Sequence, residues 1–202
     1  MRYRPALILL TVTVAGTVAV AAVFATTRSI AVELRTQLSA QTQALAFAAA
    51  GAIDPQEHRA VATARDMGAP QYQHIETTLR RMRDAWREAG IPVRFLFTMV
   101  PDPASKSGLV YMVDAEEVPK DKSKPGEEMR ILSTDAGPFD WRKPSSFEYT
   151  DAFGNFFSAF APVNGADGKV EFVVGIDLGA EQVRSVEWRV AREALLPVGI
   201  AG

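Results

Sequence analysis

An apolar, β-rich run at residues 170–178, near the end of the chain, carries a carboxylate close to its end, Asp177, and another near its start, Glu171. Alternation along a strand places the apolar side chains Phe172, Val174, Ile176 and Leu178 on one face of this run. The other face carries Gly175 and Asp177, which offer room and a charge, as a concave ligand site with few polar anchors requires. We therefore treat Asp177 as a candidate ligand-binding residue. A second interpretation stays open, because Asp177 lies two residues before a predicted helix and could cap it.

Residues that would support catalysis or metal binding are scarce. The chain has two histidines, His58 and His74, and no cysteine, which excludes a disulfide scaffold and a thiolate metal site. Gly-x-Ser-x-Gly, His-Glu-x-x-His and glycine-rich phosphate motifs do not occur in the sequence. We expect no enzymatic activity, no catalytic residues, no bound metal and no cofactor. Both histidines lie on predicted helices and are expected to be solvated, although either could sense pH.

The elements that position Asp177 are preceded by an apolar segment. From Pro5 to Thr27 the chain has 23 residues without a charge, more than the roughly 20 that cross a bilayer as a helix. Residues 1–28 are therefore predicted to be a transmembrane anchor. Arg2 and Arg4 keep the short amino-terminal end in the cytoplasm by the positive-inside tendency, which places the following residues outside. A cleaved signal peptide is the alternative, but the run is longer than the roughly 7–15 residues of a signal-peptide core.

Composition narrows the class of partner. The chain has 202 residues, 48% of them hydrophobic and 23% charged, which suits one globular domain with accessory helices. Its formal net charge is −2, and its Lys and Arg residues are scattered. Nucleic acid is therefore not an expected partner.

Periodicity gives the expected order of elements. A helix continues from the anchor to about residue 50, a second runs over 55–64 after Asp54 and Pro55, and a third over 70–89 ends at Gly90. Five antiparallel strands follow at 93–100, 109–114, 145–149, 156–163 and 170–178. The intervening residues 116–144 are expected to form a solvated loop, and 179–196 an exit helix. Residues 197–202 look like the start of a second membrane helix.

The closing half of the chain carries a sequence of short motifs that resembles a known family. The turn YTDAFG at 149–154, the strand SAFAP at 158–162, the turn DG at 167–168 and the strand VVGID at 173–177 follow in order. This order resembles the extracytoplasmic PAS-like sensor domains called PDC or Cache domains, over roughly residues 30–196. Segments at 53–58, 94–99, 111–117 and 124–128 are similar to periplasmic sensors of bacterial histidine kinases and diguanylate cyclases.

The resemblance implies a fold and a set of site residues. The fold is α+β: a PAS-like five-stranded antiparallel sheet with a long N-terminal helix and a C-terminal exit helix, preceded by a transmembrane helix. The ligand-binding residues implied are Tyr111, Asp114, Tyr149, Asp151, Ser158 and Asp177. Each has a structural alternative: the Tyr149 hydroxyl could lie at a rim, Asp151 could close its turn by an Asx hydrogen bond, and Asp114 could cap a strand end.

These observations lead to one leading interpretation. Residues 29–196 are expected to be the ligand-sensing domain of a bacterial receptor in the inner membrane, crossing once or twice, with the bulk of the chain periplasmic or extracellular. Its partners are expected to be a small-molecule ligand, the membrane and a second copy bound through the N-terminal helix. It would pass a binding-induced shift to a cytoplasmic output domain outside this chain. The alternatives are a membrane-anchored dimerisation adaptor and, less favoured, an extracytoplasmic enzyme.

Overall fold

The protein is described by a computed structural model that covers residues 4–129, 133–134, 140–151, 153–181, 183 and 185. The chain divides into two compact units. One comprises residues 1–38 and 186–202, and the other comprises residues 39–185. The sheet, its covering helices and every predicted site residue belong to the second unit.

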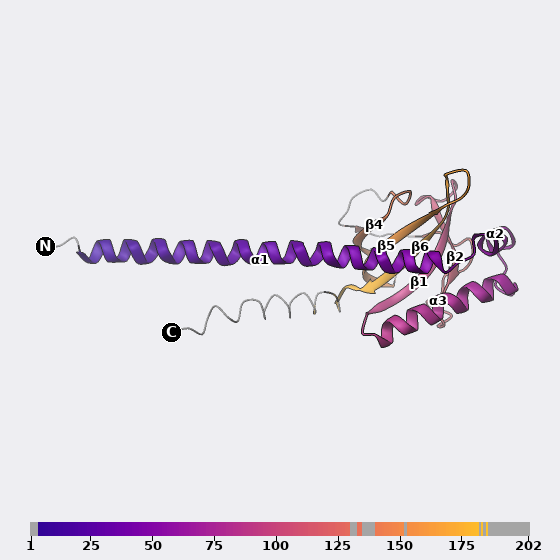
Figure 1. Cartoon of the computed structure of the whole chain (residues 1–202), viewed down its shortest axis with the longest axis horizontal. Helices are drawn as coiled ribbons and strands as arrows, with labels where there is room; N and C mark the ends of the chain where they lie inside the picture. The colour runs from indigo at the N-terminus through magenta and orange to yellow at the C-terminus, as the bar shows by residue number, and fades with distance from the viewer. Residues whose placement is uncertain are drawn as a thin grey trace. The chain divides into compact units, whose positions relative to one another are not determined.

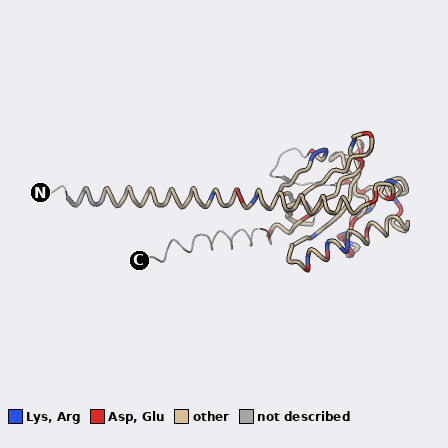
Figure 2. Tube along the Cα trace, viewed as in Figure 1, with Lys and Arg blue, Asp and Glu red and all other residues tan. Residues whose placement is uncertain are grey.

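A single helix, α1 (Arg4–Gly51), forms the start of the described chain. The span Leu10–Gly51 is long and apolar enough to cross a membrane. Its large apolar side chains are exposed, with Leu10 at 63% and Val20 at 71%. Between Leu10 and Thr27 this helix has no charged residue (Figure 2). The predicted continuation of this helix to about residue 50 is confirmed.

Two shorter helices follow in the second unit, α2 (Pro55–Ala64) and α3 (Pro70–Glu88). Asp54 caps α2 as its sequence indicates, because its carboxylate accepts the backbone N–H of Gln56 at 2.8 Å. Beyond the end of α3, Gly90 has a φ of +83°, a conformation that glycine adopts at little cost. The predicted boundaries of both helices therefore hold to within a residue or two.

The sheet contains six antiparallel strands in the order β2-β1-β6-β5-β4-β3. They are β1 (Val93–Pro101), β2 (Leu109–Asp114), β3 (Ser133–Thr134), β4 (Ser145–Asp151), β5 (Gly154–Asn164) and β6 (Val170–Gly179). The five predicted strands are all present, and the two-residue β3 is an addition from within the predicted loop. The first and last strands, β1 and β6, pair with each other inside the sheet. The predicted α+β, PAS-like fold is confirmed (Figure 1).

Helices cover one face of the sheet. One stripe of α3 is buried, and it comprises Tyr72, Ile75, Leu79 and Arg83. From α2, the ring of His58 stacks on Phe172 of β6 at 4.2 Å between centroids. The apolar face of β6 therefore packs against helices, as its alternation predicts.

The opposite face of the sheet is aromatic. Its buried cluster, the aromatic face, comprises Phe95, Phe97, Met99, Leu109, Tyr111, Met129, Phe147, Tyr149, Phe156, Phe160 and Val173. Trp141 and Val170 pack against it. The polar face of β6 points into this cluster, because Gly175 and Asp177 alternate with the helix-facing residues.

Two predicted segments lie largely or wholly outside the described residues. Helix is present at Ala180, Glu181, Val183 and Ser185, where the exit helix was expected to begin. The rest of that helix and the predicted second membrane segment at 197–202 are not among the residues that the structure describes.

Candidate functional site

Asp177 lies buried in the aromatic face, with only 2% of its surface exposed. Ser158 of β5 donates its hydroxyl hydrogen bond to one carboxylate oxygen at 2.5 Å. Tyr149 of β4 donates to the other oxygen at 3.0 Å. Three of the six predicted ligand-binding residues thus meet through their side chains. These bonds run across the sheet to two strands. The capping interpretation of Asp177 stays open, because most of the helix predicted after β6 lies outside the described residues.

Strand register explains why these side chains meet. Asp177 lies directly opposite Ser158 on one side and Phe95 on the other, and Ser158 lies opposite Phe147. Side chains opposite each other in neighbouring strands point to the same face and are close enough to touch. The carboxylate therefore lies in a cross-strand row between aromatic rings. A buried carboxylate is costly unless hydrogen bonds satisfy it, and the two hydroxyls supply that satisfaction.

A small cavity adjoins Asp177 and includes two further predicted residues. Its lining comprises Phe95, Phe97, Tyr111, Asp114, Asp121, Ser123, Phe153 and Asp177. Its volume is about 10 Å³, room for about one water molecule. Five of the six predicted residues therefore either line this cavity or hydrogen-bond to Asp177 beside it.

Asp114 has a clear structural role within this site. One carboxylate oxygen accepts the backbone N–H of Glu116 and the other that of Ser123, both at 2.8 Å. Burial raises the pKa of Asp114 to about 6, against the opposing effect of these two amides. Its two bonds hold the loop after β2 against the strand end, which matches the strand-end alternative given above.

Asp151, the sixth predicted residue, ends β4, and its backbone pairs with Gly154 across the β4–β5 turn. Its side chain lies outside what the structure describes. The predicted choice between a ligand contact and an Asx hydrogen bond at Asp151 stays open.

The expected room above Gly175 is already filled. A Cβ atom added at Gly175 would lie 2.3 Å from Cε2 and 2.6 Å from Cζ of Phe97. Phe97 was not among the predicted site residues; it is 2% exposed and packs edge-on against Tyr111 at 5.1 Å between centroids. Aromatic residues at alternate positions 95 and 97 are the signal that could have identified it, since alternation places both on the aromatic face.

The loop after β2 corrects a second expectation. It was predicted to be solvated, yet Glu116 and Ser123 are each only 5% exposed. The buried guanidinium of Arg83 donates to the carbonyl of Ala115 at 2.6 Å and to Glu117 at 3.1 Å. Helix α3 therefore anchors the beginning of this loop to the domain core.

Arg94 anchors the same loop beside the cavity. Its guanidinium contacts Glu116 at 2.7 Å and Asp121 at 3.3 Å, and it lies 4.2 Å from the ring centroid of Phe95. Contacts of Arg83 and Arg94 thus hold residues 115–123 in place along one edge of the site. The solvated-loop prediction is wrong for Glu116 and Ser123, because contacts with residues distant in sequence decide their burial, whereas residues 117–120 are exposed as predicted.

The two histidines differ from each other. His58 was expected to be solvated, but it is 1% exposed, and its Nε2 lies 2.8 Å from the Thr98 hydroxyl. Burial lowers the pKa of His58 to about 4, so the ring is neutral at pH 7. His74 is exposed as predicted and pairs with Glu57 at 2.7 Å. Within the described residues, no group of three or more His, Asp or Glu side chains is arranged to hold a metal ion.

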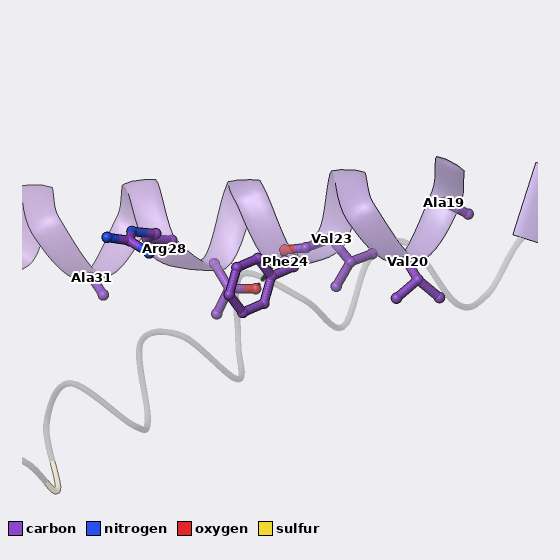
Figure 3. Close-up of a pocket in the computed structure, with 7 residues that line it drawn as sticks. Ala19, Val20, Val23, Phe24, Arg28 and Ala31 are labelled. Carbon is purple, nitrogen blue, oxygen red and sulfur yellow. Dashed lines mark hydrogen bonds between the residues drawn. The ribbon is translucent and has the colours of Figure 1, made fainter. Parts of the chain in front are cut away.

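A separate apolar surface lies on α1 in the other unit. It is lined by Ala19, Val20, Val23, Phe24, Thr27, Arg28 and Ala31, which share one side of the helix (Figure 3). These residues lie within or directly after the predicted membrane segment. An apolar helix surface of this kind is what a bilayer would cover.

Comparisons with known proteins give limited information. No protein-family model matches the chain, and no curated protein matches it. Among solved structures, it is similar to a light-oxygen-voltage domain studied with a flavin analogue, with 11% identity and a TM-score of 0.32 over 55% of this chain and 93% of that one. It is also similar to an RNA-binding light-oxygen-voltage receptor, with 12% identity and a TM-score of 0.31 over 70% of this chain and 53% of that one. Likeness at this level does not bear on ligand or activity.

Proposed function

We propose that this chain is the ligand-sensing, extracytoplasmic part of a bacterial membrane receptor of the PDC or Cache type. The single observation that carries the proposal is the position of Asp177. The Asp177 side chain is buried in the middle of an aromatic cluster, with 2% of the residue exposed, and its carboxylate accepts hydrogen bonds from the hydroxyls of Tyr149 and Ser158. A few convergent polar groups within apolar walls are the usual features of a small-molecule site.

A purely structural role explains this arrangement less well. A buried carboxylate with two hydroxyls stabilises a fold hardly more than apolar residues of similar volume would at the same positions. This holds even when the hydrogen bonds of the polar groups are satisfied. A ligand with hydrogen-bond donors could exchange with the two hydroxyls and bind the carboxylate in their place. Ligand binding would therefore explain why the cluster of Asp177, Tyr149 and Ser158 is polar although it adds little to stability.

Helix α1 supports a membrane-attached location. It is long and apolar enough to cross a bilayer, and Arg2 and Arg4 precede its apolar run. The positive-inside tendency then orients the sheet domain away from the cytoplasm. An inner-membrane location and a periplasmic site for Asp177 follow from this orientation as part of the proposal.

The sheet domain also has a physical link to α1. Gln43 of α1 donates to the Ser146 hydroxyl at 3.1 Å, and the hydroxyls of Ser39 and Ser146 are hydrogen-bonded to each other. Ser146 lies on β4, the strand that also carries Tyr149. A ligand that displaces the Tyr149 hydroxyl from Asp177 would favour one position of β4 over another, and Ser146 would transmit that preference to α1. An output domain beyond this chain would receive it.

Ligand-dependent stability tests the proposal. The full chain in lipid nanodiscs is heated with a panel of small amines, amino acids, polyols and organic acids at millimolar concentration. At a hundredfold excess over the Kd, a ligand should stabilise the folded state by about 2.7 kcal/mol, and Asp177→Asn should abolish that gain. The proposal fails if no compound raises the melting temperature, or if the gain is unchanged in Asp177→Asn.

Self-association through α1 is the second part of the proposal. Leu34, Leu38 and Leu45 recur at helical spacing on the part of α1 that follows the membrane segment. Replacing all three by Gln should weaken self-association in nanodiscs while ligand-dependent stability persists. An adaptor without a sensing role would instead dimerise and show no ligand dependence at all.

A further inference from the structure

The proposed ligand site is closed in this structure. The cavity beside Asp177 has a volume of about 10 Å³, whereas pockets for small molecules measure about 300–1,000 Å³. The ring of Phe97 fills the space above Gly175, at distances that leave no room for a methyl group there. A ligand can therefore reach Asp177 only if an aromatic ring moves.

The walls around the carboxylate consist mainly of rings. Phe95 contacts Phe156 edge-on at 5.5 Å between centroids, and Phe147 stacks on Phe160 at 5.4 Å. At the cavity edge, Phe153 is 44% exposed and contacts Phe95 at 5.8 Å. Such surroundings favour an aromatic occupant, because edge-to-face and stacked ring pairs add to the effect of apolar burial.

We propose that the site takes a small aromatic amine, whose ring replaces that of Phe97 above Gly175 and whose ammonium group binds Asp177. This inference rests on the proposed function and specifies its ligand. The incoming ring would take over the contact that Phe97 makes with Tyr111. The ammonium group would form a charge-assisted hydrogen bond with the carboxylate and lie against ring faces.

The negative charge at the site disfavours aromatic acids, which carry a charge opposite to that of aromatic amines. Three carboxylates line the cavity, those of Asp114, Asp121 and Asp177. Arg94 pairs with Asp121 at 3.3 Å, but an aromatic acid would still add a negative charge beside Asp114 and Asp177 in a space with little water, which is unfavourable. The site should therefore discriminate between benzylamine and benzoate, although both present the same ring.

In this proposal Phe97 is the latch of the site: its ring closes the space above Gly175 and must move before a ligand can bind. When the binding-competent state is a minor one, the apparent affinity falls in proportion to its population. A smaller side chain at position 97 removes the cost of opening and should increase affinity. Phe172 offers a matched control, since it is a buried phenylalanine on the opposite, helix-covered face of the same sheet.

The test measures binding of three probes to the full chain in nanodiscs by calorimetry. Benzylamine carries both ring and ammonium, cyclohexylmethylamine lacks the aromatic ring, and benzoate reverses the charge. Benzylamine should bind the wild type, with cyclohexylmethylamine at least about tenfold weaker and benzoate undetected. Phe97→Ala, or Phe97→Leu if the alanine variant does not fold, should bind benzylamine about tenfold more tightly.

Two controls identify the site. Asp177→Asn should lose at least about tenfold in benzylamine affinity, and Phe172→Leu should show no gain. Equal binding of benzylamine and cyclohexylmethylamine, an equal gain in Phe172→Leu, or unchanged binding in Asp177→Asn would each overturn the inference. If benzylamine does not bind but an aliphatic compound stabilises the wild type and not Asp177→Asn, this inference fails while the proposed function stands. If no compound binds, both fail.

Discussion

At the scale of single residues, Asp177 allows binding and folding to be separated. Asn keeps an acceptor oxygen for one hydroxyl, and its NH₂ group can donate to the other, so Asp177→Asn should change the free energy of unfolding by less than about 1 kcal/mol. Asp177→Ala removes the acceptor of both buried hydroxyls, those of Tyr149 and Ser158, and should cost about 1–3 kcal/mol. Urea unfolding of the full chain in detergent measures both. Equal losses in the two variants would show that the hydrogen bonds are not what stabilises this cluster.

A substitution at Gly175 tests how tightly the Phe97 ring packs against β6. Gly175→Ala places a methyl group in contact with the Phe97 ring, which should destabilise the fold by about 1–3 kcal/mol through overpacking. The smaller side chain in Phe97→Leu should make room for this methyl group. The double variant should therefore be more stable than the sum of the two single changes predicts, with a coupling of about 1 kcal/mol or more in a double-mutant cycle. Strict additivity would mean that the two residues do not compete for one space.

At the scale of elements, the docking of α2 should depend on pH through His58. Its folded-state pKa of about 4 lies below the ordinary histidine value of 6.5, so the unfolded chain binds more protons between these values. Stability from this group is complete above pH 6.5 and is lost as pH falls toward 4. The loss should amount to about 3 kcal/mol. His58→Gln should remove it, so the difference in unfolding free energy between wild type and variant should shrink over that window.

Asp114 should make the fold more stable as pH falls, which is opposite to the effect of His58. Burial raises its pKa from 3.8 to about 6, so the folded state binds the proton more readily between those values. The cost of its burial is full above pH 6 and is relieved as pH falls to 3.8, again by about 3 kcal/mol. Wild type should therefore gain stability relative to Asp114→Asn on acidification. Urea titrations at several pH values measure both differences, and parallel curves for wild type and either variant would contradict the corresponding assignment.

The elements were predictable from sequence to different degrees. Local patterns give α2 and α3, because Asp54, Pro55 and Gly90 mark their ends, and the five main strands follow from alternation. The placement of Asp177 on a face different from Phe172 also follows from alternation alone. Bringing it together with Tyr149 and Ser158 required the resemblance, since strand order is not encoded in any single strand.

The errors share one physical cause. The burial of His58 depends on Phe172 and Thr98, and the filling of the space above Gly175 depends on the register between β1 and β6. The fastening of Glu116 depends on Arg94. Each is a contact between residues distant in sequence. Neither periodicity nor residue type reports such contacts, so the shape of the candidate site could not be predicted from the sequence.

At the scale of the whole molecule, the proposed function requires the sheet domain to lie outside the cytoplasm, and this location would decide which ligands can reach Asp177. The chain has no cysteine, so single introduced cysteines report accessibility without background. Lys169→Cys replaces a side chain that is 86% exposed in the turn before β6, and Val14→Cys lies within the apolar run of α1. In intact bacteria, a membrane-impermeant maleimide should label position 169 and not position 14.

A cysteine at position 3 completes the topology test. The positive-inside tendency places this end in the cytoplasm, so Tyr3→Cys should react only after the cells are lysed. A mature protein that lacks position 3 by mass would instead identify a cleaved signal peptide, and the sheet domain would then be released from the membrane. Labelling at position 3 but not at 169 in intact cells would reverse the orientation. Asp177 would then face cytoplasmic metabolites, and the extracytoplasmic part of the proposed function would be wrong.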